Sequence, residues 1–129
     1  MLELLAVGIG GFIGACARFG LSKFFNQYPA FPYGTLFSNV VAGLLIGIVI
    51  GVERELIEIP THAKLFLTTG LLGGLSTFST FSLETVVLLE DGNYLKAGAN
   101  TLLNLGLSIA AVMAGFLIVK LITRVVNPT

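Results

Sequence analysis

The sequence has 129 residues, of which 55% are hydrophobic and only 11% are charged, whereas an ordinary soluble domain carries about 25% charged residues. Its mean hydropathy of +0.95 predicts a protein that folds in the lipid bilayer. Seven Lys and Arg residues balance seven Asp and Glu residues, so the chain has no basic field for nucleic acid, and we exclude nucleic acid as a partner.

Four stretches of the sequence reach the roughly 20 apolar residues that a helix needs to cross a membrane. They cover residues 4–25, 33–52, 63–89 and 97–122. The connections between them are short and carry proline, glycine and charged residues, as turns do. The sequence therefore predicts an all-α membrane protein, a single domain of four transmembrane helices over residues 1–129.

The first span carries a positive charge, Arg18, about 10 Å from its nearer end at a rise of 1.5 Å per residue. The side chain either snorkels to the headgroups or lines an aqueous vestibule, where it would concentrate anions. Lys23 can already serve as the interfacial anchor, which leaves Arg18 free for the vestibule. The stretch is longer than the apolar core of a signal peptide and no basic segment precedes it, so we expect it to be retained.

Small residues at four-residue spacing let helices approach closely in lipid. The first two spans both contain them, as Gly10, Gly14, Gly43, Gly47 and Gly51. We interpret these as packing faces, and a second copy of the chain is the simplest partner for so small a bundle. Asn39, also in the second span, is either an interhelical hydrogen-bonding residue or part of a polar path, and both interpretations stay open.

The third span is the most informative segment, because residues 70–82 read GLLGGLSTFSTFS. The adjacent Gly73 and Gly74 weaken the helix near mid-membrane, and irregular backbone survives at that depth only inside protein or along a cavity. We therefore expect the third helix to be broken there. A break releases carbonyl oxygens, which can coordinate a small cation, and opens amide groups, which favour anions.

Five hydroxyl residues alternate with two phenylalanines after the glycines. Phe78 and Phe81 are three residues apart and so lie near one another on the helix. Such rings usually pack against lipid or core, but Ser79 and Thr80 are unusual neighbours for plain packing. Because a ring edge is positive, two edge-on phenylalanines could stabilise an unhydrated anion. Glu84 follows in the same span, where an ionisable residue marks a pathway or a buried pair.

In the fourth span, Asn100, Asn104 and Ser108 lie at i, i+4 and i+8, which places them along one helix face. A polar stripe in lipid forms either one side of a pore or a hydrogen-bonded helix contact, and we favour the pore.

The basic residues hardly decide an orientation. With the N-terminus inside, four of them lie inside and two outside, or three if Arg18 is counted. The four are Arg54, Lys64, Lys120 and Arg124, and the two are Lys23 and Lys96. So weak a bias leads to the hypothesis that the chain inserts both ways round and pairs antiparallel with itself.

Three strings resemble the Fluc fluoride channels, also called the CrcB family: GACARF at 14–19, GTLFSNVVAG at 34–43 and GLLGGLSTFSTFS at 70–82. The similarity extends over all four spans in the right order. It implies an antiparallel, dual-topology homodimer with two pores that pass fluoride and largely reject chloride. It also implies a multi-pass protein of a bacterial cell membrane that passively exports cytoplasmic fluoride, relieves its toxicity and is not an enzyme.

The resemblance assigns roles to particular residues. Phe78 and Phe81 resemble the phenylalanines that face the anion path, with Asn39 as the polar residue beside them. Arg18 matches the arginine near the pore entrance, and Glu84 matches the acidic residue that follows the phenylalanine motif.

A structural sodium ion at the dimer centre is also implied, held by the backbone carbonyls of Gly73 and Ser76 from both subunits. Ser76 stands where Thr is common, which a carbonyl ligand tolerates. The family often has Tyr and Ser where this chain has Asn100 and Asn104, whereas Ser108 is retained. We expect these polar groups, together with those of the third span, to replace water stepwise around the passing anion.

Other functions remain as alternatives. A small multidrug transporter also has four spans, but it needs a deep carboxylate in its first helix, where this chain has Arg18, and Glu3 lies at the membrane edge. A non-transporting assembly subunit would use the glycine faces but leave the polar third span without a purpose. An enzyme fits least, because His62 stands alone in a loop, without a nucleophile and base pair or a metal-ligand cluster.

Overall fold

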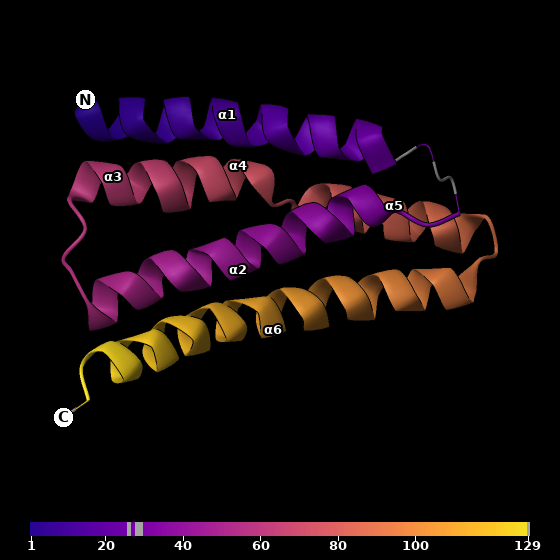
Figure 1. Cartoon of the computed structure of the whole chain (residues 1–129). Coiled ribbons are helices and arrows are strands. Elements are labelled where there is room, and N and C mark those ends of the chain that lie inside the picture. The colour runs from indigo at the N-terminus through magenta and orange to yellow at the C-terminus, as the bar shows by residue number, and fades with distance from the viewer. Residues whose placement is uncertain (26, 28–29, 129) are drawn as a thin grey trace.

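The computed structural model describes residues 1–25, 27 and 30–128. These residues form helices joined by short turns (Figure 1). The helices are α1 (Leu2–Phe25), α2 (Tyr33–Glu55), α3 (Thr61–Leu65), the π-helix η1 (Phe66–Leu72), α4 (Gly73–Leu75), α5 (Phe78–Glu90) and α6 (Tyr94–Val126). Because α3, η1 and α4 follow one another without interruption, they form the first half of one broken span, and α5 forms the second half.

Four helical segments are long and apolar enough to cross a membrane. They are Leu2–Phe25, Tyr33–Glu55, Thr61–Glu90 and Tyr94–Val126. Each contains one of the predicted spans, so the prediction of four apolar helices is confirmed. The last extends furthest beyond its prediction, since Lys120 and Arg124 end the hydrophobic run but are good helix formers.

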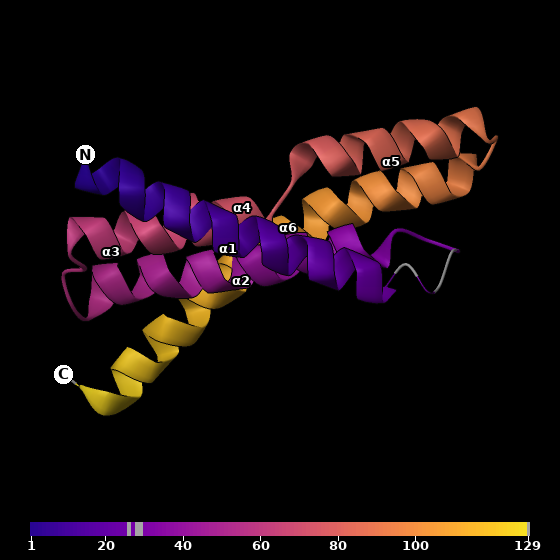
Figure 2. The same cartoon turned by 90° about the horizontal axis from the view of Figure 1, so that it is seen from above.

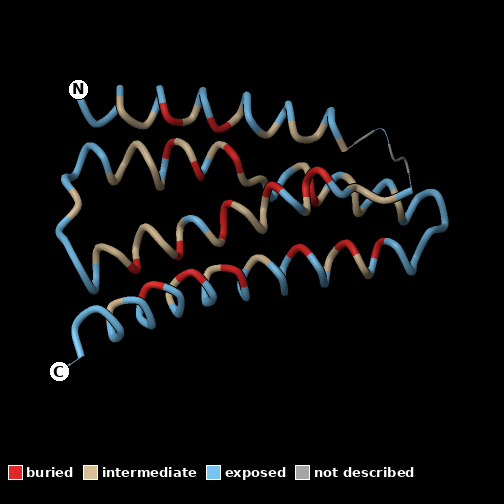
Figure 3. The backbone as a smooth tube through the Cα atoms, viewed as in Figure 1, coloured by how far each residue is buried: buried red, intermediate tan, exposed pale blue. Residues whose placement is uncertain are grey.

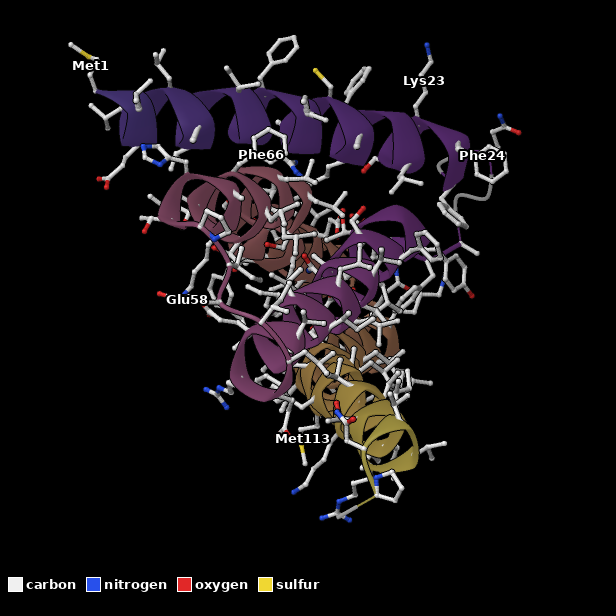
Figure 4. All side chains as sticks on the ribbon, turned by 60° about the vertical axis from the view of Figure 1, so that its left-hand side comes forward. Met1, Lys23, Phe24, Glu58, Phe66 and Met113 are labelled. Atoms are coloured by element: carbon white, nitrogen blue, oxygen red, sulfur yellow. The ribbon has the colours of Figure 1, made fainter. Side chains whose placement is uncertain are left out.

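The helices form a slab rather than a closed bundle. Seen towards its end, the molecule runs from α1 through the first half of the third span and α2 to α6 (Figure 4). Within the described residues, α1 and α6 make no contact. Figure 2 shows α5 and the first half of α6 together, diverging from the other helices. The space between these two groups is where the break in the third span lies.

Glycines bring the backbones of neighbouring helices together, as predicted. A Cβ on Gly43 of α2 would lie 2.8 Å from the carbonyl oxygen of Ser108 on α6. A Cβ on Gly10 of α1 would meet the carbonyl oxygen of Phe66 in η1. The predicted packing faces are therefore filled within the chain, and pairing with a second copy stays a prediction.

The third span is broken near its middle, as predicted, but two residues after the predicted glycines. Gly73 is helical at φ −64° and ψ −37°, whereas Ser76 (φ −79°, ψ 154°) and Thr77 (φ −152°, ψ 124°) are extended. Gly74 serves a close contact instead, because a Cβ there would lie 2.7 Å from the carbonyl oxygen of Gly11. Glycine here permits approach of α1 rather than an irregular backbone.

Both termini and the connection from α2 to α3 lie at one end of the molecule, and the turn from α5 to α6 lies at the other (Figure 1). Two basic residues at the terminal end have partners. Lys64 pairs with Glu53 at 2.8 Å, and the Arg54 guanidinium lies 4.9 Å from the ring centroid of Phe116. Insertion in both orientations stays a prediction.

Burial is concentrated where the helices face one another (Figure 3). A small apolar core of Ala42, Leu72 and Leu75 joins α2 to the first half of the third span. The outer faces carry exposed large apolar side chains such as Phe12, which is 72% exposed. Faces of this kind suit lipid or another membrane-embedded surface.

Candidate functional site

A pocket of about 510 Å³ lies beside the break in the third span. Its walls come from α2, the two halves of the third span and α6. Of the predicted site residues it is lined by Asn39, Gly73, Ser76, Phe78, Phe81, Asn104 and Ser108. Those outside the lining are Arg18, Ser79, Thr80, Glu84 and Asn100. The fold thus gathers the phenylalanines, the second-span amide and the backbone of the break around one space.

Asn39 binds the extended backbone at the break. Its Oδ1 accepts a hydrogen bond from the N–H of Thr77 at 2.7 Å, and its Nδ2 donates to the carbonyl of the same residue at 3.1 Å. Nδ2 also donates to Oδ1 of Asn104 at 2.9 Å. Unpaired backbone groups are strongly unfavourable in a membrane, so this amide replaces part of the helical hydrogen bonding lost at the break.

Thr77 caps the second half of the span, and the predicted site did not include it. Its Oγ1 accepts a hydrogen bond from the N–H of Thr80 at 3.1 Å and donates to Oγ1 of Thr80 at 3.0 Å. Ser79 Oγ lies 3.4 Å from the same oxygen. A threonine directly before a helix is a common N-cap, which is the signal that could have identified it.

The two phenylalanines stand edge to face in the first turn of α5. Their ring centroids are 5.3 Å apart and the ring planes meet at 73°. Phe81 is only 6% exposed, whereas Phe78 is 72% exposed, and both line the pocket. One ring is therefore fixed by its surroundings, and the other projects into open space.

The asparagines of α6 are buried against α2 and α5. Asn100 is 0% and Asn104 3% exposed. Asn104 Nδ2 donates to the carbonyl and to Oδ1 of Asn100, at 3.0 and 2.8 Å, and Asn100 Nδ2 donates to Oγ1 of Thr85 at 3.0 Å. Within the chain these amides make a hydrogen-bonded helix contact, the second of the two interpretations of the polar stripe.

Ser108 completes the stripe in a different way. Its hydroxyl is buried, lines the pocket and has no hydrogen-bond partner among the described residues. A hydroxyl in that state retains both a donor and acceptor sites. It is therefore a polar group of the pocket that is available to an ion or to water.

Arg18 reaches the first half of the third span. Its Nε donates to the carbonyl oxygen of Gly74 at 3.1 Å, one of the carbonyls that the end of α4 leaves without a helical partner. The charge is partly buried between α1 and α4. It compensates the negative end of the first half-helix.

Glu84 connects α5 to α2. Its Oε1 accepts a hydrogen bond of 2.6 Å from the hydroxyl of Thr35, which is 2% exposed. The other oxygen, Oε2, is buried and has no partner among the described residues. Sequence reasoning did not single out Thr35, because a threonine inside an apolar span gives no sign of which helix it faces.

The carbonyls of Gly73 and Ser76 fit a hard cation. In an unbroken helix they would accept from the N–H groups of Thr77 and Thr80, but these donate to Asn39 and to the cap instead. Oxygen atoms of this kind are the ligands that hard cations prefer. Among the described residues no cluster of His, Cys, Asp or Glu could hold a metal, so any cation here depends on the backbone.

Comparison with known proteins agrees with this architecture. Residues 5–116 match the family described as CrcB-like protein, Camphor Resistance (CrcB). A protein of Clostridium novyi named fluoride-specific ion channel FluC is 47% identical, over 95% of this chain and 97% of its own. Proteins of the same name are 46% identical in Clostridium perfringens (89% and 91%) and 45% in Serratia proteamaculans (91% and 93%). This multi-pass membrane protein belongs to the CrcB family.

Proposed function

We propose that this chain is a fluoride-specific ion channel. The relatives that bear this name align with almost the whole chain. The pocket at the broken third span supports the proposal, because it combines polar groups and ring edges at the middle of apolar helices. Polar groups are unfavourable at that depth and usually mark an ion pathway. A channel catalyses no chemical step, so no enzymatic activity is assigned.

Fluoride passes beside the two phenylalanines of α5. The positive edges of Phe78 and Phe81 replace part of its hydration without holding it as tightly as a full charge would. Ser108 adds a hydroxyl donor in the same pocket. Asn39 and Asn104 also line the pocket, whereas Ser79, Thr80 and Asn100, which the sequence assigned to the path, lie beside its lining and support it.

The two charged residues act near the path rather than in the pocket. Arg18, held by the carbonyl of Gly74, raises the local concentration of anions. Glu84, bound to Thr35, fixes the outer part of α5 against α2.

Two copies form the working unit, paired antiparallel in the membrane. The exposed apolar faces of the slab are available to a partner, and four basic residues at one end against two or three at the other give only a weak preference for one orientation. A sodium ion lies between the copies, held by the carbonyls of Gly73 and Ser76 from each. One chain supplies too few oxygens for a hard cation, which takes about six, and a second copy doubles the set.

The channel is placed in the plasma membrane of a bacterium and exports fluoride passively. Hydrogen fluoride is neutral and enters from an acidic medium, and it dissociates in the less acidic cytoplasm. A fluoride channel lets the trapped anion leave down its own gradient, which relieves its toxicity.

Efflux from liposomes tests the proposed function. Purified protein is reconstituted in vesicles loaded with fluoride or with chloride, an ionophore for potassium removes the voltage, and ion-selective electrodes record release. Fluoride should leave within seconds and chloride far more slowly. Fluoride release no faster than from protein-free vesicles would overturn the proposal, and equal release of both ions would remove its specificity.

A further inference from the structure

A chain of hydrogen-bonded side chains starts and ends on the backbone at the start of α5. Asn39 binds the backbone of Thr77 and donates to Asn104, which donates to Asn100. Asn100 donates to Thr85 at 3.0 Å, and the hydroxyl of Thr85 donates to the carbonyl of Phe81 at 2.8 Å. This chain of hydrogen bonds therefore leaves α5 at the N-cap, passes through α2 and α6, and returns within the first turns of α5.

The direction of every bond follows from the first one. The amide of Asn39 faces an N–H and a carbonyl of Thr77, so its oxygen and nitrogen cannot be exchanged without placing donor against donor. Its remaining hydrogen must then find an acceptor, which is Oδ1 of Asn104, and the same reasoning fixes Asn100. Asn39 donates one hydrogen back to the carbonyl of Thr77. Every bond between the four side chains, and the last bond to Phe81, is donated in the direction away from Thr77.

The middle of this hydrogen-bonded chain is buried. Asn100 is 0% exposed and lies outside the pocket lining, so water has little access to its bonds, whereas Asn104 is 3% exposed and lines the pocket. In such surroundings a hydrogen bond is stronger, and an unpaired partner is more unfavourable, than at a wet surface. Removing one hydrogen bond should therefore weaken the neighbouring hydrogen bonds as well.

We propose that Thr85, Asn100 and Asn104 are positioning residues, which act through Asn39 to hold the first turn of α5 and thus the rings of Phe78 and Phe81. The inference rests on the proposed function, because it assigns these residues to the placement of the fluoride path. It also separates polar groups that hold the helices in position from those that can donate a hydrogen bond to the ion. Both amide hydrogens of Asn39 and of Asn104 are already donated, whereas the hydroxyl of Ser108 has no partner among the described residues and is a free donor towards the ion.

Thr85→Val tests the last side chain in this series of hydrogen bonds, and Thr101→Val is its matched control. Both threonines are partly buried and donate to a carbonyl four residues back, but only Thr85 also accepts from another helix. Thr85→Val should slow fluoride efflux by about tenfold, the effect of one buried unpaired donor, and should lower the ratio of fluoride to chloride efflux. Thr85→Ser should restore both quantities, and Thr101→Val should match the unmodified protein.

Amide hydrogen exchange gives a reading that does not depend on transport. Thr85→Val should speed exchange at residues 77–81, in the same detergent and at the same assembly state, while Thr101→Val should not. If Thr85→Val fails to assemble, Thr85→Ala removes the hydroxyl without added bulk and is measured in its place.

The outcomes separate the two proposals. If the unmodified channel is active and the Thr85 variant matches Thr101→Val in both fluoride efflux and hydrogen exchange, the inference is overturned. An unmodified protein that carries no fluoride would instead overturn the proposed function, and faster exchange at residues 77–81 would then still support the positioning chain.

Discussion

The first half of the third span packs against α1 through backbone atoms, whereas the second half is tied to α2 and α6 through polar side chains. At the first interface, glycines such as Gly10, Gly14 and Gly74 leave no room for a methyl group. At the second, α5 is held by bonds from Asn39, Thr35 and Asn100. A methyl group added at the first interface would collide with backbone atoms, whereas a side chain changed at the second removes hydrogen bonds and leaves the helices room to stay in contact.

Gly14→Ala should have the largest effect, because it attacks the steric interface. The new Cβ would meet the carbonyl oxygen of Leu71 and lie 2.9 Å from the backbone nitrogen of Leu75. Both are backbone atoms that cannot rotate away, so we expect a loss of about 3 kcal/mol or failure to assemble. Unfolding in SDS, followed by circular dichroism, measures the loss. Gly8→Ala is the control, since its Cβ would meet no atom of the described chain within 4 Å, and equal stability of the two variants would contradict the steric account.

Asn39→Ala should come next, because it opens the polar interface at its centre. The N–H and carbonyl of Thr77 lose their partner in a membrane, which corresponds to about 2 kcal/mol of stability and should reduce fluoride efflux to near background. Asn93→Ala serves as the control, since in the described structure that side chain makes no capping hydrogen bond. Fluoride efflux from Asn39→Ala that stays within twofold of the control would show that the break holds its shape without the amide.

Phe78→Ile should separate transport from stability. The ring is 72% exposed, so its loss should hardly change unfolding, while the missing ring edge should slow fluoride efflux by about fivefold, equivalent to about 1 kcal/mol. Phe12→Ile on α1, at the same 72% exposure, controls for the loss of an exposed ring. Phe81→Ile should lower both quantities, since that ring is buried. Unchanged efflux in both Phe78→Ile and Phe81→Ile would remove the phenylalanines from the path.

Ser108→Ala should have the smallest effect, because it removes a hydroxyl with no partner among the described residues. Stability should stay the same or rise slightly, since a buried unsatisfied group disappears. Fluoride efflux should fall about threefold if the hydroxyl donates to the ion. A clear loss of stability with normal efflux would instead assign Ser108 to packing.

The sequence predicted the apolar architecture well and the polar contacts poorly. Hydropathy identified all four spans, because length and apolar content decide whether a helix can cross a membrane. The glycines at 73 and 74 predicted the break two residues too early, since glycine permits both a helix break and close helix contact, and only the position of α1 shows which applies.

Two of the missed residues share one cause. Thr85 and Thr35 occupy ordinary positions in the sequence, and a threonine inside a helix usually bonds only to its own backbone, as Thr101 and Thr123 do. These two differ from such threonines in the helix that each one faces, which depends on tertiary packing. Thr77 differs from both, because it stands directly before α5 as its N-cap. The asparagines of α6 were recognised as a stripe, but the direction of their bonds depends on the backbone of Thr77.

The π-helical turn η1 places one extra residue in the first half of the third span. The N–H of Gly73 donates to the carbonyls of Thr68 and Gly70, five and three residues back, rather than to the one four residues back as in an α-helix. A π-turn holds one residue more than an α-turn for about the same rotation, so deleting one residue of Phe66–Leu72 would leave an ordinary α-helix with α4 and the break turned only slightly. Thr77 would then still face Asn39. A deletion elsewhere in a regular helix rotates everything beyond it by about 100°, so this segment should tolerate the loss of one residue better than its α-helical neighbours do.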